Sequence, residues 1–332
     1  MKNSDDLLNE KIIILSMNVL IIGSGAVGIG LGTSLLSQKI NVSFFASHET
    51  ANEMKLHGIK RTGLLENYSF DYGEFEVYDN YSQIPDNSFD FILICTKTIF
   101  NMEISEALFK NKRILNRDFK ILTCQNGFGN DEFYLKYFNE DEVFCARIIT
   151  GFKRPQRNIS EITVYTEPIQ IGSLLNADIK CFTPIADVIT KSGIKCELTQ
   201  EIDKYLWAKM IYNCTLNPLG AILDVNYGNL MDNPFSKHIM DELIEEIFDV
   251  LKKSPYSTFW ENCEDYKQIF YSKLVMDTYD HYSSTHQDIK RKIKTEIDAL
   301  NGKVIELAEQ YDVEVNTNRT IYNLIKAIEN NF

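Results

Sequence analysis

One stretch decides how the first half of the chain folds: Met17-Asn-Val-Leu-Ile-Ile-Gly23-Ser-Gly25-Ala-Val-Gly28. Its apolar beginning is typical of a buried strand, and three glycines follow at the spacing Gly-x-Gly-x-x-Gly. Residues 29–37 then have a helical pattern, and residues 42–46 form a second apolar run. The sequence therefore predicts a strand, a glycine turn, a helix and a second strand, which together form a βαβ unit.

The glycine turn predicts a dinucleotide-binding site, because each glycine has a physical role in such sites. Gly23 and Gly25 allow a tight turn and a close approach of the backbone to a pyrophosphate, while Gly28 lets the helix pack closely on the strand. The helix N-terminus supplies N–H groups to the phosphates. The alternative is a glycine-rich turn that binds no ligand. The predicted cofactor-binding residues of this turn are Gly23, Ser24, Gly25, Ala26, Val27 and Gly28.

Further apolar runs predict that the βαβ unit is part of a doubly wound parallel sheet. Residues 89–96 are nearly continuously apolar, as in a strand that is covered on both faces, and residues 119–124 form a shorter run. The runs at 143–150, 161–165 and 169–173 are expected to add strands to the same sheet.

After Glu201 the pattern turns helical. Apolar residues at helical spacing between Ile289 and Tyr311 predict one long helix. The fold class is therefore α/β, with an N-terminal Rossmann-type doubly wound sheet over residues 17–199 and an all-α C-terminal domain over residues 200–332.

The composition is that of a soluble globular chain, with 332 residues that are 44% hydrophobic and 24% charged. A formal charge of −13 without a long basic stripe argues against nucleic acid as a partner. The uncharged run 12–38 is interrupted by glycines, so no membrane span is expected. Seven scattered cysteines without a CxxC pair indicate free thiols in a reducing cytoplasm, and no metal site is predicted. Residues 1–16 are expected to be a dispensable extension or the product of an upstream start codon.

The end of the second predicted strand bears on the choice of cofactor. NAD sites usually place Asp or Glu there, whereas NADP sites avoid that charge and often supply Arg. Here the sequence is Ala46-Ser47-His48, which permits a 2′-phosphate but offers no Arg to hold it. NADP is favoured, while Glu49 keeps NAD as the alternative. Three basic side chains are close enough in sequence to fold over the phosphate: Lys55, Lys60 and Arg61.

Polar residues follow two later strands. Lys97 comes directly after the run at 89–96, and Asn126 follows the run at 119–124 by one residue. Because ligands bind at the carboxyl edge of such sheets, both side chains are predicted to contact them. The alternatives are a solvated lysine and an Asn-Gly turn.

A line of three polar residues lies in an otherwise apolar stretch. Lys209, Asn213 and Asn217 recur at every fourth residue, so their side chains project to nearly the same side of a helix. Burying an ammonium and two carboxamides is costly unless each finds a hydrogen-bond partner, which a ligand with a carbonyl and hydroxyls supplies. The alternative is the narrow polar face of a core helix. Glu296 lies at the border of the apolar face of the long predicted helix. Periodicity alone predicts that it is solvated.

Together these residues resemble the ketopantoate reductases (2-dehydropantoate 2-reductases), within the 6-phosphogluconate-dehydrogenase-like Rossmann proteins. The resemblance covers residue 17 to about residue 327. The glycine fingerprint is shared with many families, whereas a set of later motifs is more specific: Asn126-Gly127, Leu206-Trp207-x-Lys209, Asn213, Asn217-Pro218, Ser283-Ser284-x-x-Gln287-Asp288, Thr295-Glu296-Ile-Asp298 and Asn301-Gly302.

The resemblance implies a role for each matching position. Lys209 is expected to be catalytic, as a general acid, with Glu296 as the acidic residue paired with it. The expected substrate-binding residues are Asn126, Asn213, Asn217 and Ser284. The expected cofactor contacts beyond the glycine turn are Ser47, Lys97 and Asn126. The implied reaction is NADPH-dependent reduction of ketopantoate to pantoate, a step of pantothenate and coenzyme A biosynthesis, with the dinucleotide on the first domain and the substrate on the second.

The chemistry of ketone reduction agrees with these roles. Hydride transfer builds negative charge on the carbonyl oxygen, so a cation and a proton donor are needed beside it, and Lys209 can be both. Three departures from the family pattern leave the cofactor and the exact 2-oxo acid open: Ser47 in place of Arg, His281 in place of a substrate-facing Asn, and Thr285 in place of Met. The alternatives are an NAD(P)-dependent reductase of another 2-oxo acid or opine-type substrate, and a non-catalytic dinucleotide sensor. The oligomeric state stays open, with a homodimer as one option.

Overall fold

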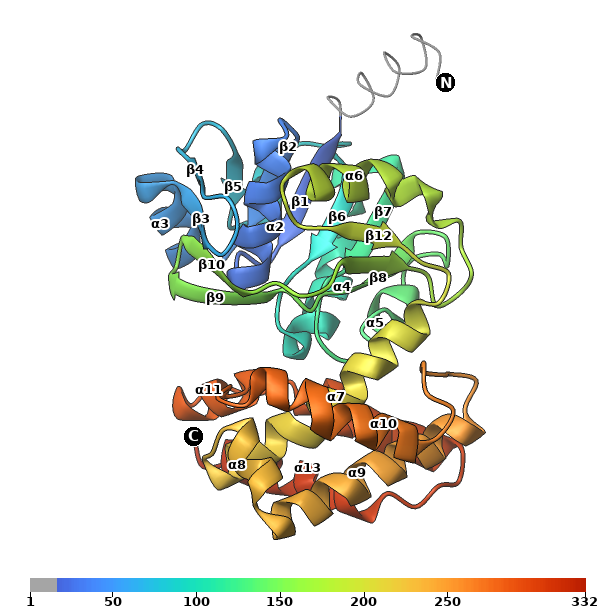
Figure 1. Ribbon diagram of the computed structural model, residues 1–332. Coiled ribbons are helices and arrows are strands. Elements are labelled where there is room, and N and C mark those ends of the chain that lie inside the picture. Colours follow the sequence, from blue (N-terminus) through green and yellow to red (C-terminus); the bar gives the residue numbers. More distant parts are fainter. Residues whose placement is uncertain (1–16) are drawn as a thin grey trace, which may run out of the picture. The chain divides into compact units, whose positions relative to one another are not determined.

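The computed structural model describes residues 17–332, which form two compact units (Figure 1). The first contains the residues up to Gln125 and residues 130–202, and the second contains residues 126–129 and 203–332. Unlike the expected ranges 17–199 and 200–332, the second unit includes the short loop 126–129. Residues 1–16, the expected extension, lie outside the described residues. Which ligand each unit binds stays a prediction.

An eight-stranded sheet forms the centre of the first unit. In spatial order its strands are β12 (Cys196–Leu198), β11 (Ile169–Gly172), β8 (Val143–Arg147), β7 (Leu115–Thr123), β6 (Phe89–Ile94), β1 (Asn18–Ile22), β2 (Asn41–Phe45) and β5 (Glu76–Tyr78). All neighbouring strands pair parallel except β11 and β8, which are antiparallel. From β5 to β8, the strands taken in chain order have the arrangement 3-2-1-4-5-6 of dinucleotide-binding folds.

Helices cover both faces of this sheet, which confirms the predicted doubly wound architecture. Alternate residues of β1 enter different cores: Val19 and Ile21 one, Leu20 and Ile22 the other. The first core also contains residues of α2 and α6, and the second contains residues of α4 and α5. The helices and 3-10 turns of the unit are α2 (Ala26–Ser37), α3 (His48–His57), η1 (Tyr81–Gln83), η2 (Thr98–Phe100), α4 (Asn101–Lys110), η3 (Lys112–Ile114), α5 (Glu132–Leu135), η4 (Ile179–Phe182) and α6 (Thr183–Lys191).

A second, four-stranded sheet contains a segment that the sequence assigned to the main sheet. Its spatial order is β4 (Tyr68–Phe70), β3 (Ile59–Gly63), β10 (Ile159–Val164) and β9 (Gly151–Gln156). The expectation that residues 161–165 extend the main sheet is therefore wrong. Alternate residues of β10 are buried, among them Ser160 and Ile162, and Ser160 Oγ donates to Ala26 O of α2 at 2.7 Å. One face of this small sheet thus packs on α2, and within the described residues its strands form no hydrogen-bonded pairs with those of the main sheet.

The described part of the second unit is helical throughout, as predicted. Its elements are α7 (Ile202–Leu223), which starts one residue before the unit, α8 (Tyr227–Asp232), α9 (Pro234–Lys253), α10 (Cys263–Ile269), the π-helical turn η5 (Phe270–Leu274), η6 (Met276–Thr278), α11 (Ser284–Lys290), η7 (Ile297–Ala299), α12 (Asn301–Gln310) and α13 (Asn316–Glu329).

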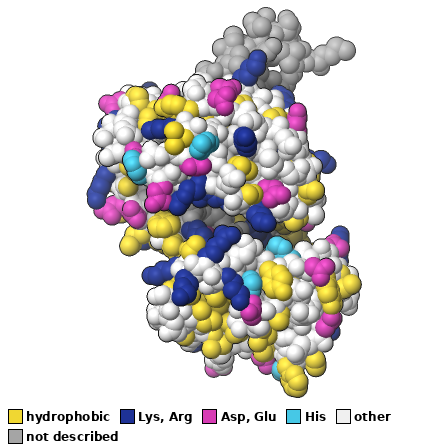
Figure 2. Space-filling view, turned by 90° about the vertical axis from the view of Figure 1, so that its left-hand side faces the viewer, with side chains coloured by type: hydrophobic (Ala, Val, Ile, Leu, Met, Phe, Trp, Pro, Cys, Tyr) yellow, Lys and Arg dark blue, Asp and Glu magenta, His cyan; other side chains and the backbone are white. Residues whose placement is uncertain are grey.

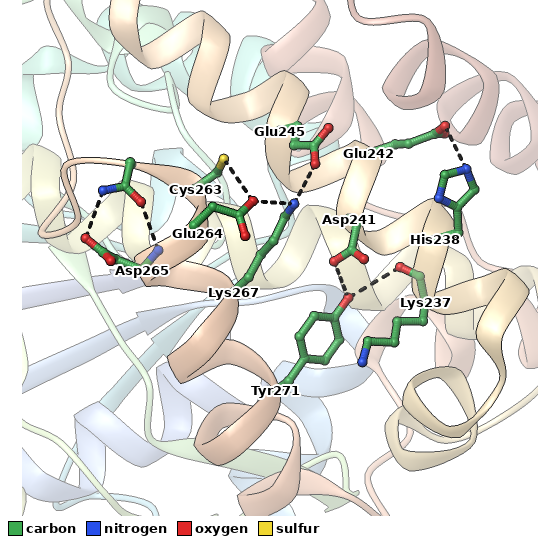
Figure 3. Close-up of polar contacts among 11 residues, drawn as sticks. Lys237, His238, Asp241, Glu242, Glu245, Cys263, Glu264, Asp265, Lys267 and Tyr271 are labelled. Carbon is green, nitrogen blue, oxygen red and sulfur yellow. Dashed lines mark hydrogen bonds and ion pairs between the residues drawn. The ribbon is translucent and has the colours of Figure 1, made fainter.

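Polar contacts attach α10 and η5 to α9 (Figure 3). Lys267 Nζ lies 2.5 Å from a carboxylate oxygen of Glu245 and 3.0 Å from one of Glu264. The hydroxyl of Tyr271 donates to Asp241 at 2.7 Å. Pairs of this kind at a protein surface contribute little stability individually, so they mainly fix how the two helices align.

The single helix predicted between Ile289 and Tyr311 is wrong. The chain leaves α11 at Lys290, Lys292 adopts a left-handed backbone with φ of 55°, and α12 begins only at Asn301. Ile293 counted as part of the apolar stripe, yet it is 41% exposed. Two separate helices, α11 and α12, and the turn between them therefore each contribute apolar residues to the core. Together these residues imitate the spacing of one long helix.

The surface of the first unit mixes side chains of different types. On the face of the first unit shown in Figure 2, acidic, basic and apolar side chains are interspersed, without a broad patch of one sign. Within residues 17–332, no helix combines the length and apolarity that a bilayer crossing needs. All seven cysteines are free thiols, as predicted.

Candidate active site

The glycine turn after β1 has the close packing that its sequence predicts. Gly23 has a φ of 101°, and a Cβ there would lie 2.5 Å from Thr96 N, beyond the end of the neighbouring strand β6. A Cβ at Gly28 would lie 2.1 Å from Gly23 O. Both positions therefore require glycine, since any side chain would push α2 and β6 away from the turn.

The same turn leaves space and hydrogen-bonding capacity for a ligand. A Cβ at Gly25 would meet no atom within 4 Å. The first intrahelical bond of α2 runs from Ile29 N to Gly25 O, and no side chain caps the helix, so the N–H groups of residues 26–28 have no partner within the helix. Ser24 Oγ is buried without a hydrogen-bond partner among residues 17–332. These features fit a dinucleotide pyrophosphate at the N-terminus of α2.

Ser47, which follows β2, lies beside an arginine that is distant in sequence. Ser47 caps α3, and its Oγ accepts from Thr50 N at 3.4 Å. Arg154 of β9 donates from Nη2 to Thr50 Oγ1 at 3.3 Å. The expectation that Arg61 can reach this point is wrong, because Arg61 is fully buried and donates to Ser34 Oγ and to the carbonyl oxygens of Glu66 and Ser192.

The ends of β6 and β7 are joined by Gln125. Its Nε2 donates to Thr96 O at 2.9 Å and to Asn101 Oδ1 at 2.7 Å. Lys97 follows Thr96, half-buried, at the start of η2. β1 and β6 pair in parallel, so Lys97 lies at the same sheet edge as the glycine turn, as predicted.

Three predicted residues lie on α7, a helix of 22 residues. Asn213 and Asn217 are 8% and 5% exposed, and Lys209 is half-buried. Among residues 17–332 the Asn213 side chain has no hydrogen-bond partner, so its carboxamide remains available to a ligand. Pro218 lacks the N–H that would bond to Cys214 O, and Asn301 Nδ2 donates to that oxygen instead, at 3.1 Å. α7 thus continues through a proline next to Asn217.

Asn126 links the predicted general acid to the predicted carboxylate. Lys209 Nζ donates to Asn126 Oδ1 at 2.6 Å, and Asn126 Nδ2 donates to Glu296 Oε2 at 3.3 Å. The amide thereby accepts from the ammonium and donates to the carboxylate. All three residues belong to the second unit, although Asn126 follows a strand of the first.

The loop 126–129 is held in the second unit by backbone and aromatic contacts. Gly127 has a φ of 92°, and a Cβ there would lie 2.5 Å from Ala299 O. Phe128 N donates to the same oxygen at 3.1 Å. The Phe128 ring contacts those of Trp207 and Tyr256, with centroids 5.0 Å and 4.7 Å apart. These contacts fix the backbone on which Asn126 sits.

Glu296 is not on the face of a long helix, as the periodicity indicated, but in the turn before η7. The preceding residue, Thr295, is buried and donates from N and Oγ1 to Glu329 Oε1, at 2.7 Å and 2.6 Å. The following residue, Ile297, is buried as well. Glu296 is thus held between two anchored neighbours, and its carboxylate contacts Asn126.

Ser284 is the exposed first residue of α11 and is attached to α7 through its neighbour. Ser283 Oγ accepts from His286 N at 3.0 Å and donates to Asn217 O at 3.0 Å. The structure therefore places the N-terminus of α11 next to Asn217. Of the two departures from the family pattern here, Thr285 is buried, while His281 contacts the Tyr227 ring at a centroid distance of 5.2 Å. Desolvation lowers the pKa of His281, which favours a neutral imidazole.

Sequence reasoning assigned no role to four residues in or near the predicted site: Gln125, Arg154, Tyr227 and Ser283. Tyr227 and Ser283 contact Asn217, whereas Gln125 and Arg154 contact neighbours of predicted residues, Thr96 and Thr50. Gln125 and Ser283 directly precede predicted site residues, so adjacency was a usable signal. Arg154 and Tyr227 lie in other elements, and nothing in the local pattern marks them.

Two family models match this chain. One, described as Ketopantoate reductase PanE/ApbA, matches residues 19–176, and the other, Ketopantoate reductase PanE/ApbA C terminal, matches residues 201–329. Among the similar curated proteins, a 2-dehydropantoate 2-reductase of Aquifex aeolicus is 35% identical over 94% of this chain and 97% of its own length. One of Pyrococcus abyssi is 25% identical over 94% and 98%.

Solved structures share the fold. A PanE/ApbA family ketopantoate reductase from Ralstonia eutropha superposes with a TM-score of 0.82 at 22% identity, covering 95% of this chain and 99% of that one. A D-mandelate dehydrogenase, solved with NADH and anilino(oxo)acetate, gives 0.83 at 20% identity with the same coverage. The two family matches extend over both units, and together with the relative from Aquifex aeolicus they establish that this chain belongs to the ketopantoate reductase family.

Proposed function

We propose that this chain catalyses NADPH-dependent reduction of ketopantoate to pantoate, a step of pantothenate and coenzyme A biosynthesis, in the cytoplasm. The observation that carries the proposal is the hydrogen-bonded series Lys209, Asn126 and Glu296. It combines a cation that can donate a proton with a carboxylate, joined by one amide. The names of the relatives supply the substrate.

Lys209 is the proton donor in this proposal. When bound, the reduced nicotinamide supplies the hydride that the 2-oxo carbon receives. The ammonium of Lys209 stabilises the negative charge that develops on the substrate oxygen and gives that oxygen a proton. Asn126 Oδ1 accepts from Nζ and orients it, and Glu296 Oε2 accepts from the other end of the same amide and holds it in place. Asn213 and Asn217 hold a hydroxyl and the carbonyl of the substrate, while Ser284 and nearby backbone N–H groups bind its carboxylate.

The preference for NADP rests on Arg154. It supplies, from β9, the guanidinium that is absent beside Ser47 in the sequence, and Thr50 Oγ1 connects the two side chains at 3.3 Å and 3.2 Å. Glu49, which kept NAD as the alternative, has its carboxylate 2.7 Å from Arg157. A 2′-phosphate beside Ser47 therefore meets a cation, while the nearby carboxylate is already paired.

A second candidate function is reduction of a different 2-oxo acid. It is favoured by His281 and Thr285, which depart from the family pattern near Asn217 and Ser284. The neighbouring D-mandelate dehydrogenase structure makes an aryl 2-oxo acid one compound to include in a test.

The experiment is a panel of NADPH-oxidation assays with ketopantoate, 2-oxoisovalerate and phenylglyoxylate, repeated with NADH. We expect the highest kcat/KM for ketopantoate with NADPH, and pantoate as the product. A higher value for another acid would establish the second candidate. Absence of turnover with every acid, while NADPH still binds, would favour a dinucleotide sensor. Light scattering on the same sample measures the oligomeric state, for which a homodimer is one option.

A further inference from the structure

Asn217 has both of its oxygen acceptors engaged within the protein. Tyr227 Oη donates to Asn217 Oδ1 at 2.7 Å, and Ser283 Oγ donates to the backbone oxygen of Asn217 at 3.0 Å. The Asn217 side chain is buried on the same helix as Lys209. None of residues 17–332 accepts a hydrogen bond from its Nδ2 group. The amide therefore offers two N–H donors to a ligand and keeps its oxygen for Tyr227.

Tyr227 is a fixed donor. It is 2% exposed, and desolvation holds the pKa of its phenol well above 10, so the hydroxyl keeps its single proton at neutral pH. Its ring contacts Tyr212 and His281, with centroids 5.8 Å and 5.2 Å apart. Its N–H donates to His281 O at 3.2 Å. These contacts hold the ring in place, so the phenolic oxygen stays beside Asn217 Oδ1.

This contact makes the two ends of the carboxamide unequal. If the amide rotated by half a turn, Nδ2 would face the phenol, and the phenolic proton would have no acceptor. We propose that Tyr227 is a positioning residue that holds the Asn217 carboxamide with Nδ2 toward the substrate. This subsite then accepts a carbonyl, carboxylate or hydroxyl oxygen and rejects an ammonium group, which can only donate. The inference deepens the proposed function and rests on it.

The test compares two tyrosines of the same cluster. Tyr212 is the matched control, because its ring contacts that of Tyr227 while its hydroxyl pairs with Thr278 Oγ1 at 2.7 Å, away from the predicted site residues. KM and kcat are measured for Tyr227→Phe and Tyr212→Phe with saturating NADPH. The substrate is whichever 2-oxo acid the wild type reduces fastest. We expect Tyr227→Phe to raise KM about five- to tenfold, with a smaller change in kcat, and Tyr212→Phe to stay within about twofold.

A second variant shows whether Tyr227 acts through Asn217. In an Asn217→Ala background, adding Tyr227→Phe is expected to leave KM within about twofold, because the amide that it orients is gone. The same rise in both backgrounds, or equal rises for the two tyrosine variants, would overturn the role of Tyr227. An unchanged KM in Tyr227→Phe would do so too, with the proposed function intact. Failure of the wild type to reduce any acid would instead overturn the proposed function and this role with it.

Discussion

Two regions of the second unit hold the predicted site residues in opposite ways. α7 carries Lys209, Asn213 and Asn217 on one helix, where four-residue spacing alone places them on one side. Glu296 lies between α11 and α12, where its position depends on residues from elsewhere, above all Glu329 and Asn126. Spacing therefore finds a site built on one helix, whereas a site closed by distant contacts requires the tertiary structure.

Loss of the lysine on α7 is expected to have the largest effect. Lys209→Ala removes the proton donor, so kcat should fall by ~100-fold or more, on the scale of general acid catalysis. NADPH binding should persist, since all the predicted cofactor contacts except Asn126 lie in the first unit. Steady-state kinetics and a fluorescence titration measure the two. Lys252→Ala, which removes an exposed lysine paired with Asp249 on α9, is the control and should behave like the wild type. Near-normal turnover in Lys209→Ala would show that Lys209, Asn213 and Asn217 form only the polar face of a core helix.

The second-largest effect is expected from loss of Glu329, which anchors the turn that carries Glu296, and it should appear in the free energy of unfolding. Glu329→Ala leaves the N–H and hydroxyl of Thr295 buried without their acceptor, so the free energy of unfolding should fall by about 2–3 kcal/mol. In folded protein, kcat should fall as well, because Glu296 loses its anchored neighbour. Urea unfolding measures the first effect. Glu309→Ala, which breaks an exposed pair with Arg319, should cost less than about 0.5 kcal/mol. Equal stabilities of the two variants would show that Glu329 does not hold this turn.

In the first unit, Arg154 resembles Glu296, because its contact with the Ser47 region comes from a residue about a hundred positions later in the chain. Arg154→Ala should weaken NADPH binding by about tenfold, as expected for loss of a charge-assisted hydrogen bond, and leave NADH binding nearly unchanged. Lys153→Ala, which removes an exposed charge from the same strand, is the matched control. Isothermal titration with each cofactor gives the dissociation constants. Equal losses for NADPH and NADH would mean that Arg154 supports the fold and not the 2′-phosphate.

The smallest effect is expected where exposed ion pairs join α7 to α11. Asp224 accepts from Lys290 and from His286 Nε2, both at 2.7 Å, and these contacts lower the pKa of its carboxyl. A lowered pKa gives stability that is present above the unfolded pKa and lost as pH falls through the folded value. Asp224→Asn should therefore lower Tm slightly at pH 7, and the difference from the wild type should vanish in acid. Asn suits the left-handed backbone at this position, which has a φ of 58°. A pH-independent difference would exclude the ion pairs as its cause.

Much of the first unit could be predicted because its signals are local. The glycine turn requires glycine at Gly23 and Gly28 for steric reasons that any chain with this strand and helix shares. The apolar run of β6 predicts burial on both faces. β10 was misassigned because an alternating strand pattern does not say which strands it pairs with. Its partners, β3 and β9, are fixed by packing on α2.

The candidate site could be predicted only in part. Periodicity found Lys209 and its two asparagines, whereas Glu296 came from the resemblance and was placed on the wrong element. Tyr227 gives no signal in sequence, since a buried tyrosine is an ordinary core residue until its hydroxyl is seen on Asn217. Pairings between residues far apart in sequence, such as Thr295 with Glu329, depend on how the helices pack.

The most direct test of the account asks whether Lys209 and Glu296 act as one unit through Asn126. The measurement is kcat for Lys209→Ala, Glu296→Gln and the variant with both changes. Residues that act together have non-additive effects, so the double variant should lie within about threefold of Lys209→Ala alone. A loss in the double variant equal to the product of the two single losses would contradict the account, because the lysine and the carboxylate would then act independently.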